Sequence, residues 1–178
     1  MTYTADIQKK ERSFLPHDFV VTQWTDLEPY FKDLLNRDIS GIDGLKKWLQ
    51  DQSELEAVVS EDACWRQIKM TCDTQNKDLE EAFNYFCLHI QPHIQPYADA
   101  LNKKLMASPL LKELEPEKYA TYLRNVKKSI ELFREENIPL QAEIAVLQQQ
   151  YGQITGAMTV EVDGKEYTLQ QAAKFLEN

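Results

Sequence analysis

The sequence predicts a mostly α-helical fold with one small β-hairpin near its C-terminus. About six segments of the 178-residue chain repeat their apolar residues at helical spacing, whereas one short stretch alternates apolar and polar residues. Glycine is scarce, with five residues in the whole chain. We therefore expect a single multi-helical domain over residues 1–178, with helices within 12–157, a β-hairpin at 158–167 and a final helix at 168–177.

The first helix is expected to follow an extended lead-in at residues 12–16, because a residue that precedes a proline avoids the helical region. Thr25 and Glu28 have the spacing of a capping box. That start places Pro29 in the first turn, where its missing N–H does little harm. The apolar stripe that follows ends near Arg37 and consists of Leu27, Tyr30, Phe31, Leu34 and Leu35.

Helical spacing continues through the middle of the chain. One helix is predicted from about Ile42, and its apolar stripe resumes from about Glu54. The longest segment, residues 77–107, contains Pro92 and Pro96, each of which removes a backbone donor. We therefore expect this segment to kink or restart at the prolines.

Two later segments carry heptad-like apolar seams. The first consists of Tyr119, Tyr122, Leu123, Val126, Ile130 and Phe133, and the second of Leu140, Ile144, Leu147, Tyr151 and Ile154. The connection at 135–139 is short, which favours an antiparallel helical hairpin within one fold. A dimeric coiled coil is the weaker alternative, because about two heptads are too few.

The C-terminal stretch changes its period from helix to strand. Residues 158–162 alternate, Asp163-Gly164 is a strong hairpin turn, and residues 165–167 supply the return strand. Thr168 can then cap a last helix. A two-stranded hairpin alone is marginal in water, so it must lean on helices or on something outside this chain.

Composition excludes several classes of protein. The net charge of −9 argues against sequence-independent nucleic-acid binding, which needs clustered cations. No apolar run is long enough to span a membrane, and residues 1–13 lack the apolar core of a secretory signal. A cytoplasmic location is therefore expected.

The chain contains three cysteines, Cys64, Cys72 and Cys87. This odd number favours reduced, packed thiols.

The most tempting chemical constellation is His89 and His93, which an unbroken helix would place on one face, as zinc sites require. Pro92 disturbs that turn, and His93 continues an apolar stripe, so a core or boundary histidine is the preferred interpretation. Acidic pairs are interpreted as solvated charge; they are Glu80-Glu81, Glu115 with Glu117, and Glu135-Glu136. No phosphate-binding glycine loop is present. We therefore predict no catalytic, cofactor-binding or metal residue.

The three tryptophans of the chain are interpreted as core anchors, namely Trp24, Trp48 and Trp65.

Several sequence blocks, taken in order, resemble the N-terminal region of oligoendopeptidase F-like enzymes, a branch of the thimet oligopeptidase-like zinc metallopeptidases. The blocks are Arg12-Ser13-Phe14-Leu15-Pro16, Trp24 with Leu27-Glu28-Pro29-Tyr30-Phe31, Leu34-Leu35-Asn36-Arg37, Trp65-Arg66, Met70-Thr71-Cys72-Asp73-Thr74, Ile90 with Pro92, Leu101-Asn102-Lys103-Lys104-Leu105, Leu132-Phe133-Arg134-Glu135-Glu136-Asn137-Ile138-Pro139-Leu140, Gly156-Ala157-Met158-Thr159-Val160, Asp163-Gly164-Lys165 and Thr168-Leu169. The likeness extends from about residue 12 to the end.

The resemblance implies a larger, mostly helical hydrolase that cleaves oligopeptides in a deep channel between two lobes. In that family one zinc ion is held by His-Glu-x-x-His and a downstream glutamate, and the motif's glutamate activates the water. This chain contains no His-Glu pair. The family's catalytic half would begin beyond Asn178, so no zinc ligand is expected here and the chain alone should be inactive.

Two functions remain open at this stage. The chain is either the non-catalytic N-terminal part of such a metalloendopeptidase, forming one wall of the peptide channel, or a free-standing helical interaction module without activity. In the first case its partners are the missing catalytic half and an oligopeptide substrate, with no nucleic acid and no membrane. A weak homodimer through Leu169, Ala172 and Leu176 is also expected, because these side chains would then lack cover.

Overall fold

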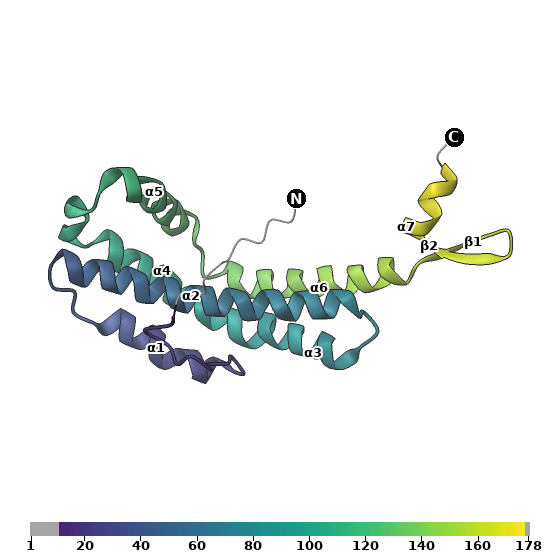
Figure 1. Ribbon diagram of the computed structural model, residues 1–178, viewed down its shortest axis with the longest axis horizontal. Coiled ribbons are helices and arrows are strands. Elements are labelled where there is room, and N and C mark those ends of the chain that lie inside the picture. Colours follow the sequence, from purple (N-terminus) through teal and green to yellow (C-terminus); the bar gives the residue numbers. More distant parts are fainter. Residues whose placement is uncertain (1–10, 177–178) are drawn as a thin grey trace. The chain divides into compact units, whose positions relative to one another are not determined.

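The predicted helical fold with one hairpin is confirmed by a computed structural model, which describes residues 11–176 (Figure 1). The helices are α1 (Trp24–Asn36), α2 (Gly41–Cys72), α3 (Lys77–Tyr85), α4 (Gln91–Met106), α5 (Pro116–Leu132), α6 (Asn137–Ala157) and α7 (Leu169–Ala172), with a π-helical turn η1 (Phe86–Ile90) and the 3-10 turns η2 (Pro109–Glu113) and η3 (Ala173–Leu176). Strand β1 (Thr159–Val162) pairs antiparallel with β2 (Lys165–Thr168). Residue 177 of the predicted last helix lies outside the described residues. Within residues 11–176, no helix combines the length and apolar character that crossing a bilayer requires.

The chain divides into two compact units. Unit 1 comprises Met1–Asp62 and Tyr97–Leu132, and unit 2 comprises Ala63–Pro96 and Phe133–Asn178. Helices α2 and α4 each contribute residues to both units. A single domain over the whole chain stays a prediction.

The core of unit 1 forms where α1, α2 and α4 present their apolar faces. Trp48 is fully buried, as predicted, and its indole N–H donates to the carbonyl oxygen of Leu34 (2.8 Å). Trp24 is half-buried, whereas Trp65 in unit 2 is 53% exposed, so the core role predicted for Trp65 is wrong. Other buried apolar side chains of unit 1 are Leu15, Val21, Leu27, Phe31, Leu34, Leu45, Leu55, Val58, Leu101, Leu105, Leu114 and Val126.

Helix α1 begins earlier than predicted, so Thr25 lies inside it and not at its N-cap. The capping group is the carboxylate of Asp26, which accepts from the backbone N–H groups of Thr22 and Gln23 (both 2.9 Å). A carboxylate is a stronger acceptor than a hydroxyl and also suits the positive end of the helix dipole. Hydrogen bonds, first that from the Thr22 hydroxyl, lower the pKa of Asp26. Because the start moves, Pro29 lies inside the helix and not in its first turn.

The segment with two prolines responds by a local change of helix type. Just before Pro92 the helix widens into η1, where the N–H of Gln91 donates to the carbonyl oxygen of Phe86, five residues back. A proline ring inside an α-helix clashes with the carbonyl group four residues back, and a π-turn moves that carbonyl group away. The predicted break is thus a single π-turn, and α4 continues through Pro96.

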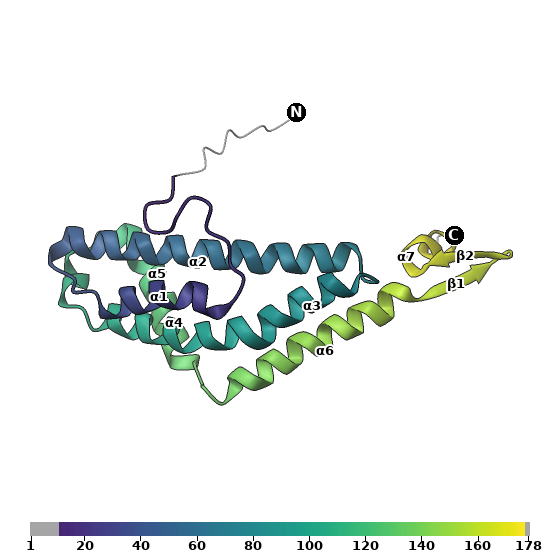
Figure 2. The same ribbon diagram turned by 90° about the horizontal axis from the view of Figure 1, so that it is seen from below.

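The hairpin of unit 2 has the predicted turn and its own helical support. Asp163 and Gly164 both have positive φ (53° and 74°), which matches the right-handed twist of the strands. Thr168 caps α7, as predicted. Figure 2 shows α7 folded back beside the strands, and the rings of Tyr167 and Phe175 meet edge to face at 5.1 Å. The hairpin therefore leans on the segment that follows it.

Helix α6 turns its apolar seam outward. Every residue of that seam is more than half exposed, namely Leu140, Ile144, Leu147, Tyr151 and Ile154. Its inward side instead carries buried Gln149 and half-buried Ala145 and Gln153. The seam is thus not covered within unit 2, whose interior receives the opposite face of α6.

Candidate functional site

Both histidines of the predicted pair lie at the surface of unit 2. His89 is exposed in η1 and its ring lies beside that of Tyr85, with 5.1 Å between the centroids. His93 is exposed in the first turn of α4, so the core or boundary position predicted for it is wrong. Among residues 11–176, no three His, Cys, Asp or Glu side chains come close enough to hold a metal ion.

The acidic pairs behave as surface charge. Glu80 accepts from the ammonium of Lys77 (2.7 Å), which is the main reason that its pKa lies below the ordinary value. Glu115 is exposed and forms an ion pair with the half-buried Lys46 (3.0 Å). The remaining members are exposed, namely Glu81, Glu117, Glu135 and Glu136.

The cysteines divide into two environments. Cys87 is buried, as predicted for a packed thiol, and burial raises its pKa. Cys64 and Cys72 are exposed, so the packed state predicted for them is wrong. All three are free thiols.

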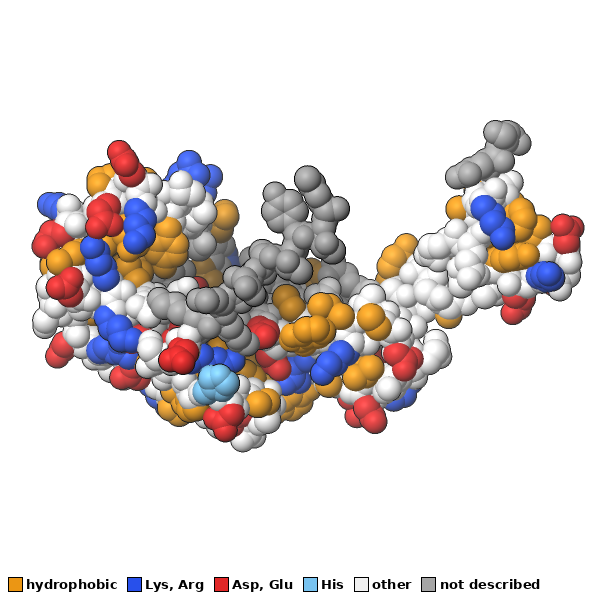
Figure 3. Space-filling view, viewed as in Figure 1, with side chains coloured by type: hydrophobic (Ala, Val, Ile, Leu, Met, Phe, Trp, Pro, Cys, Tyr) orange, Lys and Arg blue, Asp and Glu red, His pale blue; other side chains and the backbone are white. Residues whose placement is uncertain are grey.

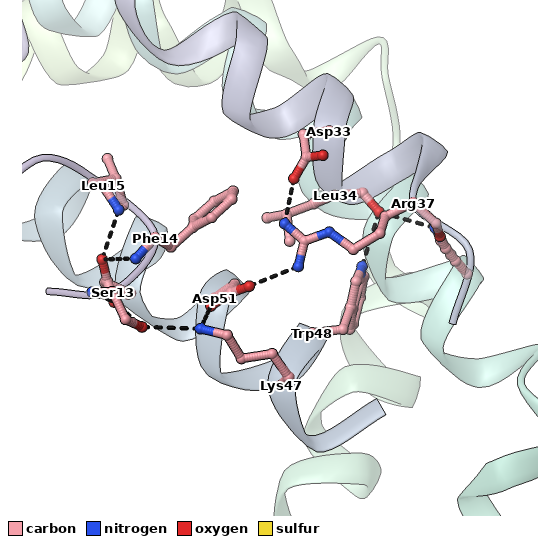
Figure 4. A network of polar contacts seen from close by, with 11 residues as sticks. Ser13, Phe14, Leu15, Asp33, Leu34, Arg37, Lys47, Trp48 and Asp51 are labelled. Atoms are coloured by element: carbon pink, nitrogen blue, oxygen red, sulfur yellow. Dashed lines mark hydrogen bonds and ion pairs between the residues drawn. The ribbon is translucent and has the colours of Figure 1, made fainter. Parts of the chain in front are cut away.

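Unit 1 contains a polar network that joins segments distant in sequence (Figure 4). Arg37, at the C-terminal end of α1, donates to Asp51 of α2 (2.6 Å) and forms a second ion pair with Asp33. Lys47 donates to the other oxygen of Asp51 (2.7 Å) and to the hydroxyl of Ser13 (3.0 Å). The side chain of Asp51 is only 3% exposed, and two cations compensate its charge.

Glu54 fixes the lead-in segment onto α2. Its carboxylate accepts from the backbone N–H groups of Ser13 (2.9 Å), Phe14 (2.9 Å) and Leu15 (2.8 Å). Burial opposes ionisation, but these N–H groups outweigh it, so the pKa of Glu54 lies below its ordinary value. The guanidinium of Arg37 lies 5.1 Å from the centre of the Phe14 ring, which links this segment to the network.

Lys104 closes the C-terminal end of α1. Its ammonium donates to the carbonyl oxygens of Leu34 (2.9 Å), Leu35 (2.8 Å) and Arg37 (2.5 Å). The last carbonyl groups of a helix have no partner within it, and a cation also suits the negative end of its dipole. Lys104 therefore ties α4 to α1.

Three sequence blocks that carry the family resemblance meet in this network, namely residues 12–16, 34–37 and 101–105. Their polar side chains hold backbone segments in place. Helical periodicity assigns each block to its own segment, so it could not predict that they meet. The one sequence signal that connects these three blocks is that they occur together, in order, in the family resemblance.

A second polar feature of unit 1 is a cavity of about 500 Å³ between α2 and α5. Glu56 and Tyr122 line it, and Gln52 donates to the Glu56 carboxyl (2.8 Å). Desolvation raises the pKa of Glu56, and the hydrogen bond from Gln52 partly offsets this. Desolvation also raises the pKa of Tyr122 to about 12, with a further contribution from the charge of Glu56. Both pKa values are thus raised although Glu56 and Tyr122 are solvent-exposed, and sequence reasoning did not identify this cavity.

Apolar side chains also reach the surface in the C-terminal segment of unit 2, over the hairpin and α7 (Figure 3). Leu169, Phe175 and Leu176 are exposed there, the last by 84%. Unit 2 therefore exposes apolar side chains at two places, the seam of α6 and this C-terminal segment.

Comparison with known proteins identifies the family. No curated protein and no solved structure matches the chain. A family model described as the peptidase M3 N-terminal domain matches residues 14–133, about two thirds of the chain. The match includes the blocks 34–37 and 101–105 of the polar network and the block 12–16 from Phe14 onward. This finding confirms the resemblance to thimet oligopeptidase-like metallopeptidases. The chain belongs to the peptidase M3 N-terminal domain family.

Proposed function

We propose that this chain is the non-catalytic N-terminal part of a zinc-dependent, oligoendopeptidase F-like metalloendopeptidase, where it forms one wall of the peptide channel. Zinc and the water-activating glutamate belong in this proposal to a separate catalytic half that carries His-Glu-x-x-His. The substrates are oligopeptides and the location is cytoplasmic. Family membership supports the assignment to a metallopeptidase.

The observation that carries the proposal is the outward apolar seam of α6. Five large side chains, each more than half exposed, are spaced 4, 3, 4 and 3 residues apart. Together they present on the order of 500 Å² of surface, near the upper limit for the largest apolar patch of a typical monomer. Such a stripe is typical of a face that a partner covers.

The charge on α6 supports the same interpretation. Glu143 is the one charged side chain among residues 137–157, although the whole chain has a net charge of −9. A partner can therefore pack against this helix without desolvating several charges. The exposed C-terminal segment, with Leu169 and Leu176, provides further apolar surface for the same partner.

The decisive experiment uses the reading frame that encodes this chain. We expect an in-frame downstream segment with His-Glu-x-x-His, which would be produced separately and mixed with this chain. The two pieces should form a complex and restore chelator-sensitive cleavage of a quenched fluorescent peptide. Leu147→Asp in the α6 seam should weaken the complex at least tenfold, because it places a charge in the apolar contact. Leu132→Asp, at an exposed leucine of α5 outside the seam, is the matched control.

Two outcomes would contradict the proposed function. A natural stop codon after Asn178, or equal binding by the Leu147 and Leu132 variants, would contradict the proposal. The first of these outcomes would favour a free-standing helical interaction module.

A further inference from the structure

Unit 2 contains a cavity of about 200 Å³ between the end of α2, α3 and α6. Its inner part includes Met70 and Gln149, both buried, and the half-buried ring of Phe83. Exposed Gln67 and Gln148 lie among the lining residues that reach solvent. None of the described residues that line the cavity is charged. The cavity therefore suits an uncharged group.

Gln149 is the informative residue of this cavity. Gln149 is only 5% exposed, yet neither Oε1 nor Nε2 of its side chain has a hydrogen-bond partner among residues 11–176. By contrast, Gln153, one turn further along α6, donates from Nε2 to the carbonyl oxygen of Thr74 (3.3 Å). Buried polar groups are nearly always paired, because an unpaired amide loses its hydration without compensation. The two free atoms of Gln149 thus indicate a missing partner.

The space beside Gln149 follows from the sequence of α6. Ala145 and Gly152 flank Gln149 on the same helix face at spacings of four and three residues, and both line the cavity. A Cβ added at Gly152 would meet no heavy atom within 4 Å. Two small residues on either side of a long amide leave room that larger residues would fill.

We propose that this cavity binds a primary carboxamide, such as the side chain of a glutamine or asparagine in a peptide. A primary carboxamide offers a donor and an acceptor side by side, so it can pair with both amide atoms of Gln149 in a cyclic arrangement. The apolar walls at Met70 and Phe83 accommodate its aliphatic stem. A carboxylate of the same shape lacks the donor and loses its hydration in an uncharged site. The proposal does not depend on the peptidase function, because the cavity lies within unit 2.

Propionamide is a suitable first probe, and the isotope-labelled chain reports on it through the side-chain NH₂ signal of Gln149 in NMR spectra. We expect this signal to shift saturably with propionamide. Propionate should bind at least tenfold more weakly, and so should N,N-dimethylpropionamide, which has no N–H donor. A short peptide that contains glutamine should compete with propionamide, whereas the matched glutamate peptide should not. These measurements need no variant, so they decide the proposal even where a substitution affects folding.

A variant then tests the residue itself. Gln149→Met keeps a long flexible side chain but removes both polar atoms, so its thermal midpoint should equal or exceed that of the unmodified chain. It should bind propionamide at least tenfold more weakly, as followed by the backbone amide of Gly152. Gln150→Met, at an exposed glutamine of α6 that does not line the cavity, should bind as before. The absence of a saturable shift, or equal binding of propionamide and propionate, would show that water alone occupies the cavity and would overturn the proposal.

Discussion

Two glutamates of α2, Glu54 and Glu56, should respond in opposite ways to the same substitution. Glu54→Gln replaces a carboxylate that accepts three backbone N–H bonds with an amide that has one acceptor oxygen. A hydrogen bond to a charged group contributes about 1.5–3 kcal/mol, and partial solvent screening reduces this, so we expect a loss of about 1 kcal/mol in the free energy of unfolding at neutral pH. Glu56 is exposed, but partial desolvation still raises its pKa, so Glu56→Gln should slightly increase the free energy of unfolding at neutral pH.

The pH dependence of these two effects follows from the sign of each pKa shift. The pKa of Glu54 is lowered in the folded state, so its contribution is present above the ordinary value of 4.5 and is lost as the pH falls below it. The pKa of Glu56 is raised, so its ionised form costs stability at neutral pH, and this cost disappears as the pH falls towards 4.5. Both variants should therefore approach the unmodified chain in acid.

Urea unfolding, followed by tryptophan fluorescence at pH 7 and pH 3.5, measures both effects. Glu113→Gln, at an exposed carboxylate of η2, is the matched control and should change the free energy of unfolding by less than about 0.5 kcal/mol at either pH. The reasoning is refuted if Glu54→Gln is neutral at pH 7, or if Glu56→Gln destabilises the chain as much as Glu54→Gln does.

Three further predictions concern the isolated chain. With added zinc it should not cleave a quenched fluorescent peptide; chelator-sensitive cleavage that is lost in His93→Ala would contradict this. Trp48→Phe should lower the free energy of unfolding by about 2 kcal/mol in urea titrations, because it removes the donor to Leu34 and leaves a small cavity. The chain should also form a micromolar-class dimer that salt strengthens by screening its net charge of −9. Light scattering tests this dimer; a strict monomer at high concentration and high salt, or a dimer unaffected by Leu169→Asp combined with Leu176→Asp, would exclude it.

Local signals in the sequence were sufficient for much of the fold. The helical stripe around Trp48 and the turn at Asp163-Gly164 predict their elements correctly, because spacing and backbone conformation are local properties. The start of α1 was mispredicted because two acceptors compete for nearby N–H groups, and the carboxylate of Asp26 prevails. Local patterns could not predict the polar network, because Ser13 and Lys104 come from the two separate stretches of sequence that make up unit 1.

Helix α6 shows most clearly what periodicity cannot decide. Its spacing identifies two faces, but the side that packs inward depends on neighbours that periodicity does not describe. The face with Ala145, Gln149 and Gln153 packs inward, and the seam with Leu147 is left outside. An amide buried without a partner and a large apolar stripe left in water are both unfavourable for a chain that functions alone. Two different occupants would remove the two costs: a primary carboxamide in the cavity, and a catalytic half against the seam. Because the two surfaces lie on separate faces of the same helix, Gln149→Met and Leu147→Asp should each abolish one interaction and leave the other intact.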